Sequence, residues 1–79
     1  MRANEKEKPQ MHMHPEEFAD IQHDLGLSDN ELRDALSLSK ETGSRMIRRF
    51  KTGEVAISGP VATCMFAFED GFRPEAWPS

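Results

Sequence analysis

The chain has 79 residues, of which 37% are hydrophobic and 30% charged, and its formal net charge is −4. This length predicts one small domain whose core is too small to enclose a large substrate. No apolar run approaches the about 20 residues that span a membrane, the N-terminal segment lacks the apolar core of a secretory signal, and the single cysteine, Cys64, excludes an intrachain disulfide. We therefore expect a protein of the reducing cytoplasm.

The first part of the chain predicts a tail and one helix. Residues 1–12 are polar and lack periodic apolar positions, which is typical of a disordered tail. The helix is expected to begin at Pro15, which suits the first helical position, and to end before Gly26. Met13 and Phe18 stand at the two positions of a hydrophobic staple. The inward face of this helix is expected to carry Phe18, Ile21 and Leu25.

A second helix is expected over residues 29–36. Ser28 and Glu31 have the spacing at which a serine and a glutamate cap each other's backbone amide groups. The segment SLS then interrupts the helix, with Leu38 available to fill the core and Ser39 as the cap of the next helix. The inward side chains of the second helix are expected to be Leu32, Ala35 and Leu36.

A third helix is expected within residues 40–52 and is ended by Gly53. Two starting points are open. The helix either begins at Lys40 and contains Gly43, which costs about 1 kcal/mol, or it begins near Ser44 after a loop. Glycine together with serine and threonine is typical of a loop, and this favours the second alternative.

Positive charge is concentrated in residues 40–51. This stretch has five bases and one acid, a net charge of +4, whereas the other 67 residues have a net charge of −8. A helical projection gives the stretch two faces. The inward face holds Gly43, Met46, Ile47 and Phe50, and the outward face holds Arg45, Arg48, Arg49 and Thr52. We expect the inward face to pack in the core and the outward face to bind a polyanion, since the surrounding acids would direct only this face towards it.

The last helix is expected between Pro60 and Gly71. Its inner stripe is predicted to consist of Val61, Cys64, Met65 and Phe68. Because its other positions are also largely apolar, we expect it to cover a partner as well as the core. Residues 72–79 are expected to form an extension that packs on the core or on a dimer interface, with Phe72 and Trp77 as a lid.

Two short helices joined by a segment with an inward leucine, the second helix basic outside and apolar inside, are the parts of a helix-turn-helix. The stretch LGLSDNELRDALSLS, followed by MIRRFKTGE and ISGPVA, resembles the Cro and lambda-repressor-like (XRE-type) regulators of bacteria and their phages. The resemblance spans about residues 15–68 and implies a compact bundle of four or five helices that usually binds operator DNA as a dimer. We expect this domain to extend over residues 13–71. The chain departs from the family pattern by an insertion of about one helical turn at residues 40–43. The last part of the pattern is matched by Ile47, Arg48, Arg49, Phe50, Gly53 and Glu54.

The expected function is therefore that of an all-α, sequence-specific regulator of transcription, a repressor that binds an inverted-repeat operator in double-stranded DNA as a homodimer. No catalytic triad, phosphate loop or carboxylate pair can be argued from the sequence, so neither enzymatic activity nor a cofactor is expected. The expected DNA-binding residues are Lys40, Thr42, Ser44, Arg45, Arg48, Arg49 and Lys51. The expected dimer interface consists of Met65, Phe66, Phe72 and Trp77.

The sequence leaves other interpretations open. A helix-turn-helix can also serve protein binding, as an antiactivator or antitoxin, through the apolar last helix and the aromatic C-terminus. A basic helix face can also be no more than a solvated surface. The three histidines and Cys64 lack the ligand spacing of a structural zinc site, so no metal is expected.

Overall fold

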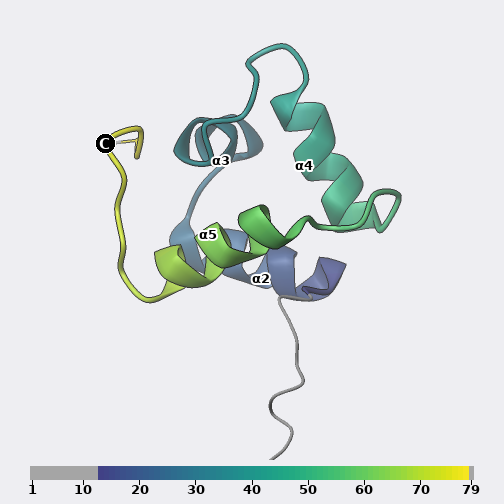
Figure 1. The fold of residues 1–79 in the computed structure, drawn as a ribbon, viewed down its shortest axis with the longest axis horizontal. Helices are drawn as coiled ribbons and strands as arrows, with labels where there is room; N and C mark the ends of the chain where they lie inside the picture. Colours follow the sequence, from purple (N-terminus) through teal and green to yellow (C-terminus); the bar gives the residue numbers. More distant parts are fainter. Residues whose placement is uncertain (1–12, 79) are drawn as a thin grey trace, which may run out of the picture.

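A computed structural model describes residues 13–78, and within this range the chain forms four α-helices and no strand (Figure 1). The predicted all-α fold is confirmed. The predicted disordered tail, residues 1–12, lies outside the described residues. The helices are α2 (Pro15–Leu25), α3 (Asp29–Ala35), α4 (Gly43–Thr52) and α5 (Gly59–Glu69).

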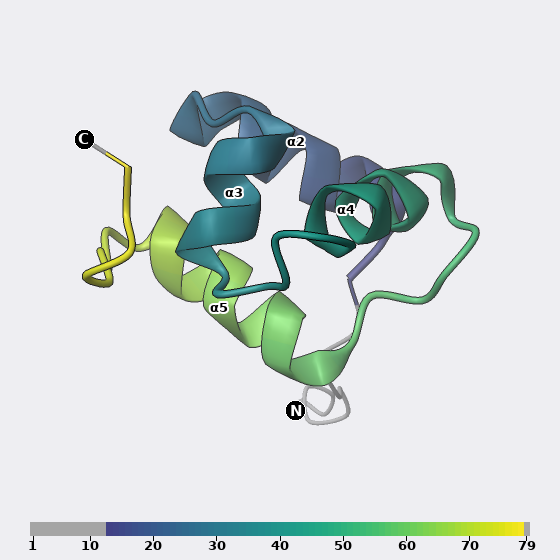
Figure 2. The ribbon, with the colours of Figure 1, turned by 90° about the horizontal axis from the view of Figure 1, so that it is seen from above.

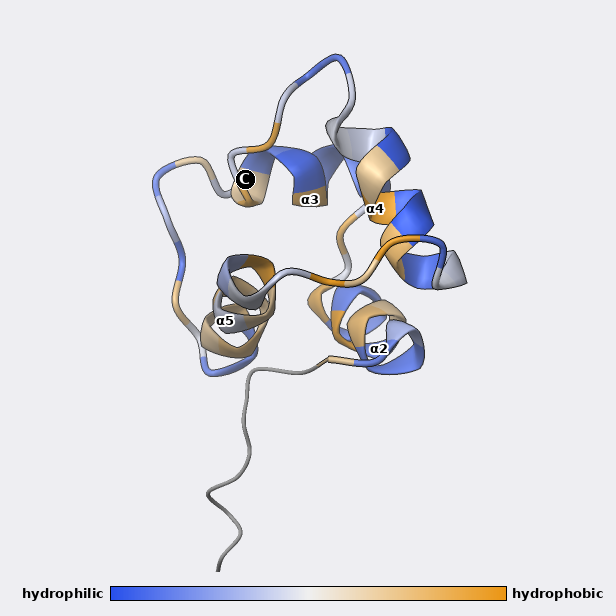
Figure 3. Ribbon diagram, turned by 45° about the vertical axis from the view of Figure 1, so that its right-hand side comes forward, coloured by the Kyte–Doolittle hydropathy of each residue, from blue (hydrophilic) through white to orange (hydrophobic). Residues whose placement is uncertain are grey.

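The four helices enclose a single core. α4 contacts both α2 and α3, and α5 contacts α2 (Figure 2). In α4 the hydrophobic residues lie on the side that faces the other helices, and the hydrophilic residues lie on the outer side (Figure 3). Every helix contributes to the core, whose fully buried side chains include Phe18, Leu32, Ile47, Ala62 and Met65.

The predicted helix boundaries agree closely with the observed ones for α2 and α3. Pro15 begins α2, and Gly26 ends it in the left-handed conformation with a φ of 71°. The capping box of α3 is formed, because the Ser28 hydroxyl accepts from the Glu31 amide at 3.1 Å and the Glu31 carboxylate accepts from the Ser28 amide at 2.9 Å. Each of the two side chains thereby accepts a hydrogen bond from the backbone amide of the other residue.

The last helix begins and faces the core differently from the prediction. Ser58, which the sequence analysis did not single out, is the N-cap of α5, and its hydroxyl accepts from the Val61 amide at 3.4 Å. The predicted inner stripe is wrong in one place, because Cys64 is exposed and Ala62 is fully buried. Ala62, Met65 and Phe68 form the buried stripe. Nearly all of this helix is apolar, so hydrophobicity alone could not identify the inward face.

The segment after α5 folds back along the molecule (Figure 1). The Trp77 ring meets the Phe68 ring edge-on, with 5.0 Å between centroids, and the Arg73 guanidinium lies 4.2 Å from the centre of the Trp77 ring. Arg73 also donates a hydrogen bond to the Phe68 carbonyl at 2.8 Å. The extension therefore packs on the end of α5, and Trp77 covers part of the core. No helix in residues 13–78 is long and apolar enough to cross a membrane.

Candidate nucleic-acid interface

The start of α4 decides which basic residues belong to a helix. α4 begins at Gly43, and residues 40–42 form a turn before it. The loop alternative is therefore the correct one. Ser39 does not cap α4 as predicted, because its hydroxyl accepts from the Glu41 amide at 3.1 Å and so closes the turn instead. The N-cap of α4 is Thr42, which makes no side-chain capping bond.

Gly43 has a steric role that the sequence analysis missed. It is buried where α4 approaches the end of α3. A Cβ atom at this position would lie 2.5 Å from Cγ of Arg33 and 2.9 Å from Cβ of Leu38, both closer than carbon atoms approach in proteins. The absence of a side chain thus allows the first turn of α4 to lie against α3. The close approach at Gly43 thus sets the position of α4 relative to the core.

The inner face of α4 is anchored by aromatic and aliphatic packing. Ile47 is fully buried, and Phe50 is 4% exposed. The Phe50 ring meets the Phe18 ring of α2 edge-on at a centroid distance of 5.6 Å, a favourable arrangement for two aromatic rings. The prediction that Phe50 is a core residue is confirmed. Met46 is partly buried against the same cluster.

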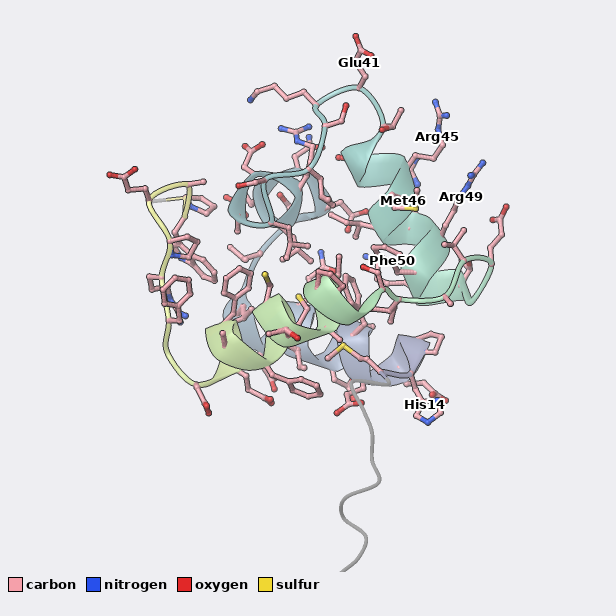
Figure 4. All side chains as sticks on the ribbon, in the orientation of Figure 1. His14, Glu41, Arg45, Met46, Arg49 and Phe50 are labelled. Carbon is pink, nitrogen blue, oxygen red and sulfur yellow. The ribbon has the colours of Figure 1, made fainter. Side chains whose placement is uncertain are left out.

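The outer face of α4 presents arginine side chains to solvent. Arg45 and Arg48 are exposed and Arg49 is half-buried. Arg45 and Arg49 project away from the body of the molecule, on the side of α4 opposite to Phe50 (Figure 4). With Thr52 and Glu54, the three arginines line a shallow, open depression. Among residues 13–78, no acid lies within 4.0 Å of the charged nitrogens of Arg45 or Arg48.

A second edge of α4 faces α3 and has intramolecular partners. The Ser44 hydroxyl donates a hydrogen bond to the side-chain oxygen of Asn30. Lys51 Nζ lies 2.7 Å from Oδ1 of Asp29, and that oxygen also accepts from Gln22 Nε2 at 2.9 Å. Ser44 and Lys51, which were predicted to contact DNA, are therefore engaged in packing α4 against the N-terminus of α3. This network joins three helices, and no signal in the sequence pointed to it.

The Asp29 carboxylate has an altered acidity. Burial by itself raises the pKa of Asp29, but hydrogen bonds from Gln22 and Lys51 and the positive charges of Lys51 and Arg48 together outweigh burial. The pKa of Asp29 is consequently lower than its ordinary value of 3.8. Asp29 is thus held as a carboxylate by the residues that surround it.

The two remaining predicted DNA-binding residues lie in the turn before α4. Lys40 and Thr42 are exposed, and Lys40 Nζ is 3.8 Å from Oδ1 of Asp34. The Lys40 side chain is 81% exposed, so this ion pair is weak and screened by solvent. Lys40 and Thr42 lie at the end of α4 opposite to Glu54, and they are free to meet a ligand that extends beyond the helix.

The predicted dimer residues separate into buried and exposed ones. Met65 is fully buried, so the prediction that it lies in a dimer interface is wrong. It belongs to the inward stripe of α5 and has no surface to offer. Phe66 and Trp77 are partly buried against the core. Phe72 is 57% exposed, although its ring stacks parallel to that of Phe68 at 6.4 Å.

No metal site is found in the part of the chain that the structure describes, since no three His, Cys, Asp or Glu residues of residues 13–78 come together. Comparison of the chain with protein-family models, curated proteins and solved structures gave no match. The geometry of α4 and its surroundings therefore carries the functional interpretation.

Proposed function

We propose that the chain is a regulator of transcription that binds double-stranded DNA as a homodimer, with α4 in the major groove, and represses the promoter that its operator overlaps. The observation that carries this proposal is the division of α4: Arg45, Arg48 and Arg49 line one outward depression, while Ile47 and Phe50 hold the opposite side in the core. A helix anchored in this way presents charge in a fixed orientation.

The dimensions and chemistry of α4 support this proposal. Its ten residues extend about 15 Å, and the major groove of B-DNA accommodates an α-helix. Arginine can donate two hydrogen bonds to the O6 and N7 atoms of guanine, and it can also bind phosphate. The acids elsewhere on the chain disfavour approach of DNA to the other faces, because the net charge outside residues 40–51 is −8.

Dimerisation follows from the small number of available charges. Three arginines per protomer give few phosphate contacts, so two half-sites about one helical turn apart are needed for useful affinity. Phe72 is the large apolar side chain most exposed in residues 13–78, and it offers apolar surface to a second copy. The symmetry of a homodimer would match an inverted-repeat operator.

The proposal is tested by selecting duplexes from random sequence and measuring their affinity by fluorescence anisotropy. We expect Arg45→Ala, Arg48→Ala and Arg49→Ala each to weaken binding to the selected duplex by about tenfold or more. Arg73→Gln serves as a control that removes one positive charge outside α4, and DNA affinity should be unchanged when sedimentation shows that the oligomeric state is also unchanged, because Arg73 packs on Trp77. Unaltered binding in all three α4 variants would rule out the proposal.

A second candidate is protein binding through the aromatic C-terminus. The 57% exposure of Phe72 and the partial exposure of Phe66 favour it. Salt separates the two functions: DNA binding should show a slope of log affinity against log salt as steep as about −5 if all arginines of a dimer contact phosphate. A protein partner held by apolar contacts should show little salt dependence and should be lost in Phe72→Ser.

A further inference from the structure

Glu54 is an acid at the C-terminal edge of the basic surface. It lines the same depression as Arg45, Arg48 and Arg49, and it is the acidic member of that set. Its carboxylate Oε2 lies 3.6 Å from Nε of Arg49. A negative charge here opposes the attraction of phosphate by the neighbouring arginines. Glu54 therefore weakens the general affinity of this surface for nucleic acid.

The backbone fixes where the Glu54 side chain starts. Gly53 ends α4 in the left-handed conformation with a φ of 82°. The Glu54 amide then donates to the Arg49 carbonyl at 3.0 Å and to the Thr52 hydroxyl at 3.4 Å. The chain reversal thus returns residue 54 to the side of α4 on which Arg49 lies. The proximity of the carboxylate to Arg49 is a consequence of the helix end.

A stabilising role does not account for this pair. The Arg49 and Glu54 side chains are 43% and 63% exposed, and ion pairs of this kind contribute little to folding. A glutamate near the C-terminus of a helix also meets the negative end of the helix dipole. Glu54 is therefore expected to act on the ligands that Arg49 can bind.

The geometry of the Arg49 guanidinium determines which of its ligands the Glu54 carboxylate disfavours. With Glu54 on the Nε side of Arg49, the two terminal nitrogens have no hydrogen-bond partner within residues 13–78 and can both donate to one ligand. Guanine offers two uncharged acceptors in the spacing that these nitrogens match, whereas phosphate brings a negative charge towards the carboxylate. The Glu54 carboxylate therefore weakens the binding of Arg49 to a guanine edge less than its binding to a phosphate.

We propose that Glu54 is a specificity-determining residue, which directs Arg49 to a guanine edge and away from phosphate. This proposal rests on the proposed function in DNA binding. It works by selective repulsion, in that the carboxylate weakens binding to any sequence but weakens it least where Arg49 meets guanine.

The test compares Glu54→Gln with the unaltered chain on two duplexes, one selected from random sequence and one of scrambled sequence. We expect Glu54→Gln to bind the scrambled duplex about threefold to tenfold more tightly, with a salt slope steeper by about two, because Arg49 of each protomer becomes free to bind a phosphate. Affinity for the selected duplex should rise less, so the ratio of the two affinities should fall.

Glu41→Gln is the matched control, since it removes the same charge from the turn before α4, at the opposite end of the helix from Glu54, where the Glu41 side chain points out of the molecule (Figure 4). It should leave the ratio of the two affinities unchanged. In an Arg49→Ala background, Glu54→Gln should no longer alter the ratio. An equal rise for both duplexes, or the same change from Glu41→Gln, would overturn the role of Glu54. Absence of duplex binding by the unaltered chain would instead overturn the proposed function.

Discussion

Two ion pairs lie on different edges of α4, and they differ in burial and in partners. Lys51 and Asp29 are 2.7 Å apart, with side chains 28% and 27% exposed, and Gln22 shares the same carboxylate oxygen. Arg49 and Glu54 are 3.6 Å apart and considerably more exposed. The first pair holds α4 to α3, and the second leaves its arginine accessible. Bases that are equivalent in the sequence thus have different functions in the fold.

The largest effect is expected from a change that displaces α4 from α3. Gly43→Ala introduces a Cβ against Arg33 and Leu38, and overpacking of this kind destabilises by about 1–3 kcal/mol. The gain of about 1 kcal/mol that alanine has over glycine in a helix interior applies only in part here, because Gly43 is the first residue of α4. The free energy of unfolding from urea denaturation measures the outcome.

Gly59→Ala is the matched control for Gly43→Ala. Gly59 begins α5, and apart from its chain neighbours and the backbone of its own helix no atom of the described residues lies within 4 Å of the position of its Cβ. We expect this substitution to be neutral or to stabilise the fold. Equal responses of the two glycines would show that steric contact does not fix the start of α4.

The next largest effect on stability is expected at the ion pair between Lys51 and Asp29. Lys51→Met keeps the aliphatic stem but removes the charge, and it leaves Asp29 with Gln22 as its remaining side-chain partner. Hydrogen bonds to charged groups contribute about 1.5–3 kcal/mol, so we expect the free energy of unfolding to fall by an amount near the lower end of this range. Unchanged stability would contradict a structural role for Lys51.

A smaller effect on the free energy of unfolding is expected from acidification. Because the folded-state pKa of Asp29 lies below its ordinary value of 3.8, its contribution to stability is complete above that value and is lost as pH falls through the folded-state pKa. The stability difference between the unaltered chain and Asp29→Asn should therefore shrink on acidification. A difference that is constant across this range in urea denaturation would contradict the network around Asp29.

The smallest effect on stability is expected at the exposed pair. Arg49→Met is the counterpart of Lys51→Met on the other edge of α4. Because its ion pair is solvent-exposed, we expect the free energy of unfolding to change by less than about 0.5 kcal/mol. A loss as large as that of Lys51→Met would remove the distinction between the two edges.

Much of the fold follows from local sequence signals. Ser28 with Glu31, Pro15 with Gly26, and the spacing of Ile47 and Phe50 predict helix ends and inward faces correctly because each signal acts within one helix. The face of α5 was misjudged because its composition lacks contrast. Nothing in local spacing predicts that Cys64 is exposed.

The candidate site was predicted in part. Outward projection of Arg45, Arg48 and Arg49 follows from helical periodicity, and Figure 4 shows Arg45 and Arg49 on that side. The engagement of Lys51 and Ser44 depends on how α3 packs beside α4, a tertiary relation between residues 22 and 14 positions apart. The steric role of Gly43 depends on the same packing. Sequence periodicity carries no information about such neighbours.

The central claim is that the outer face of α4, with its three arginines, binds DNA, and that the edge of α4 with Lys51 stabilises the fold. It is tested most directly by comparing Arg45→Ala and Lys51→Met for affinity to one selected duplex of about 20 base pairs, long enough for two half-sites. Both proteins are first shown to be folded by circular dichroism. We predict a loss of about tenfold or more for Arg45→Ala and a change within about twofold for Lys51→Met. Equal losses, or a larger loss for Lys51→Met, would contradict the claim.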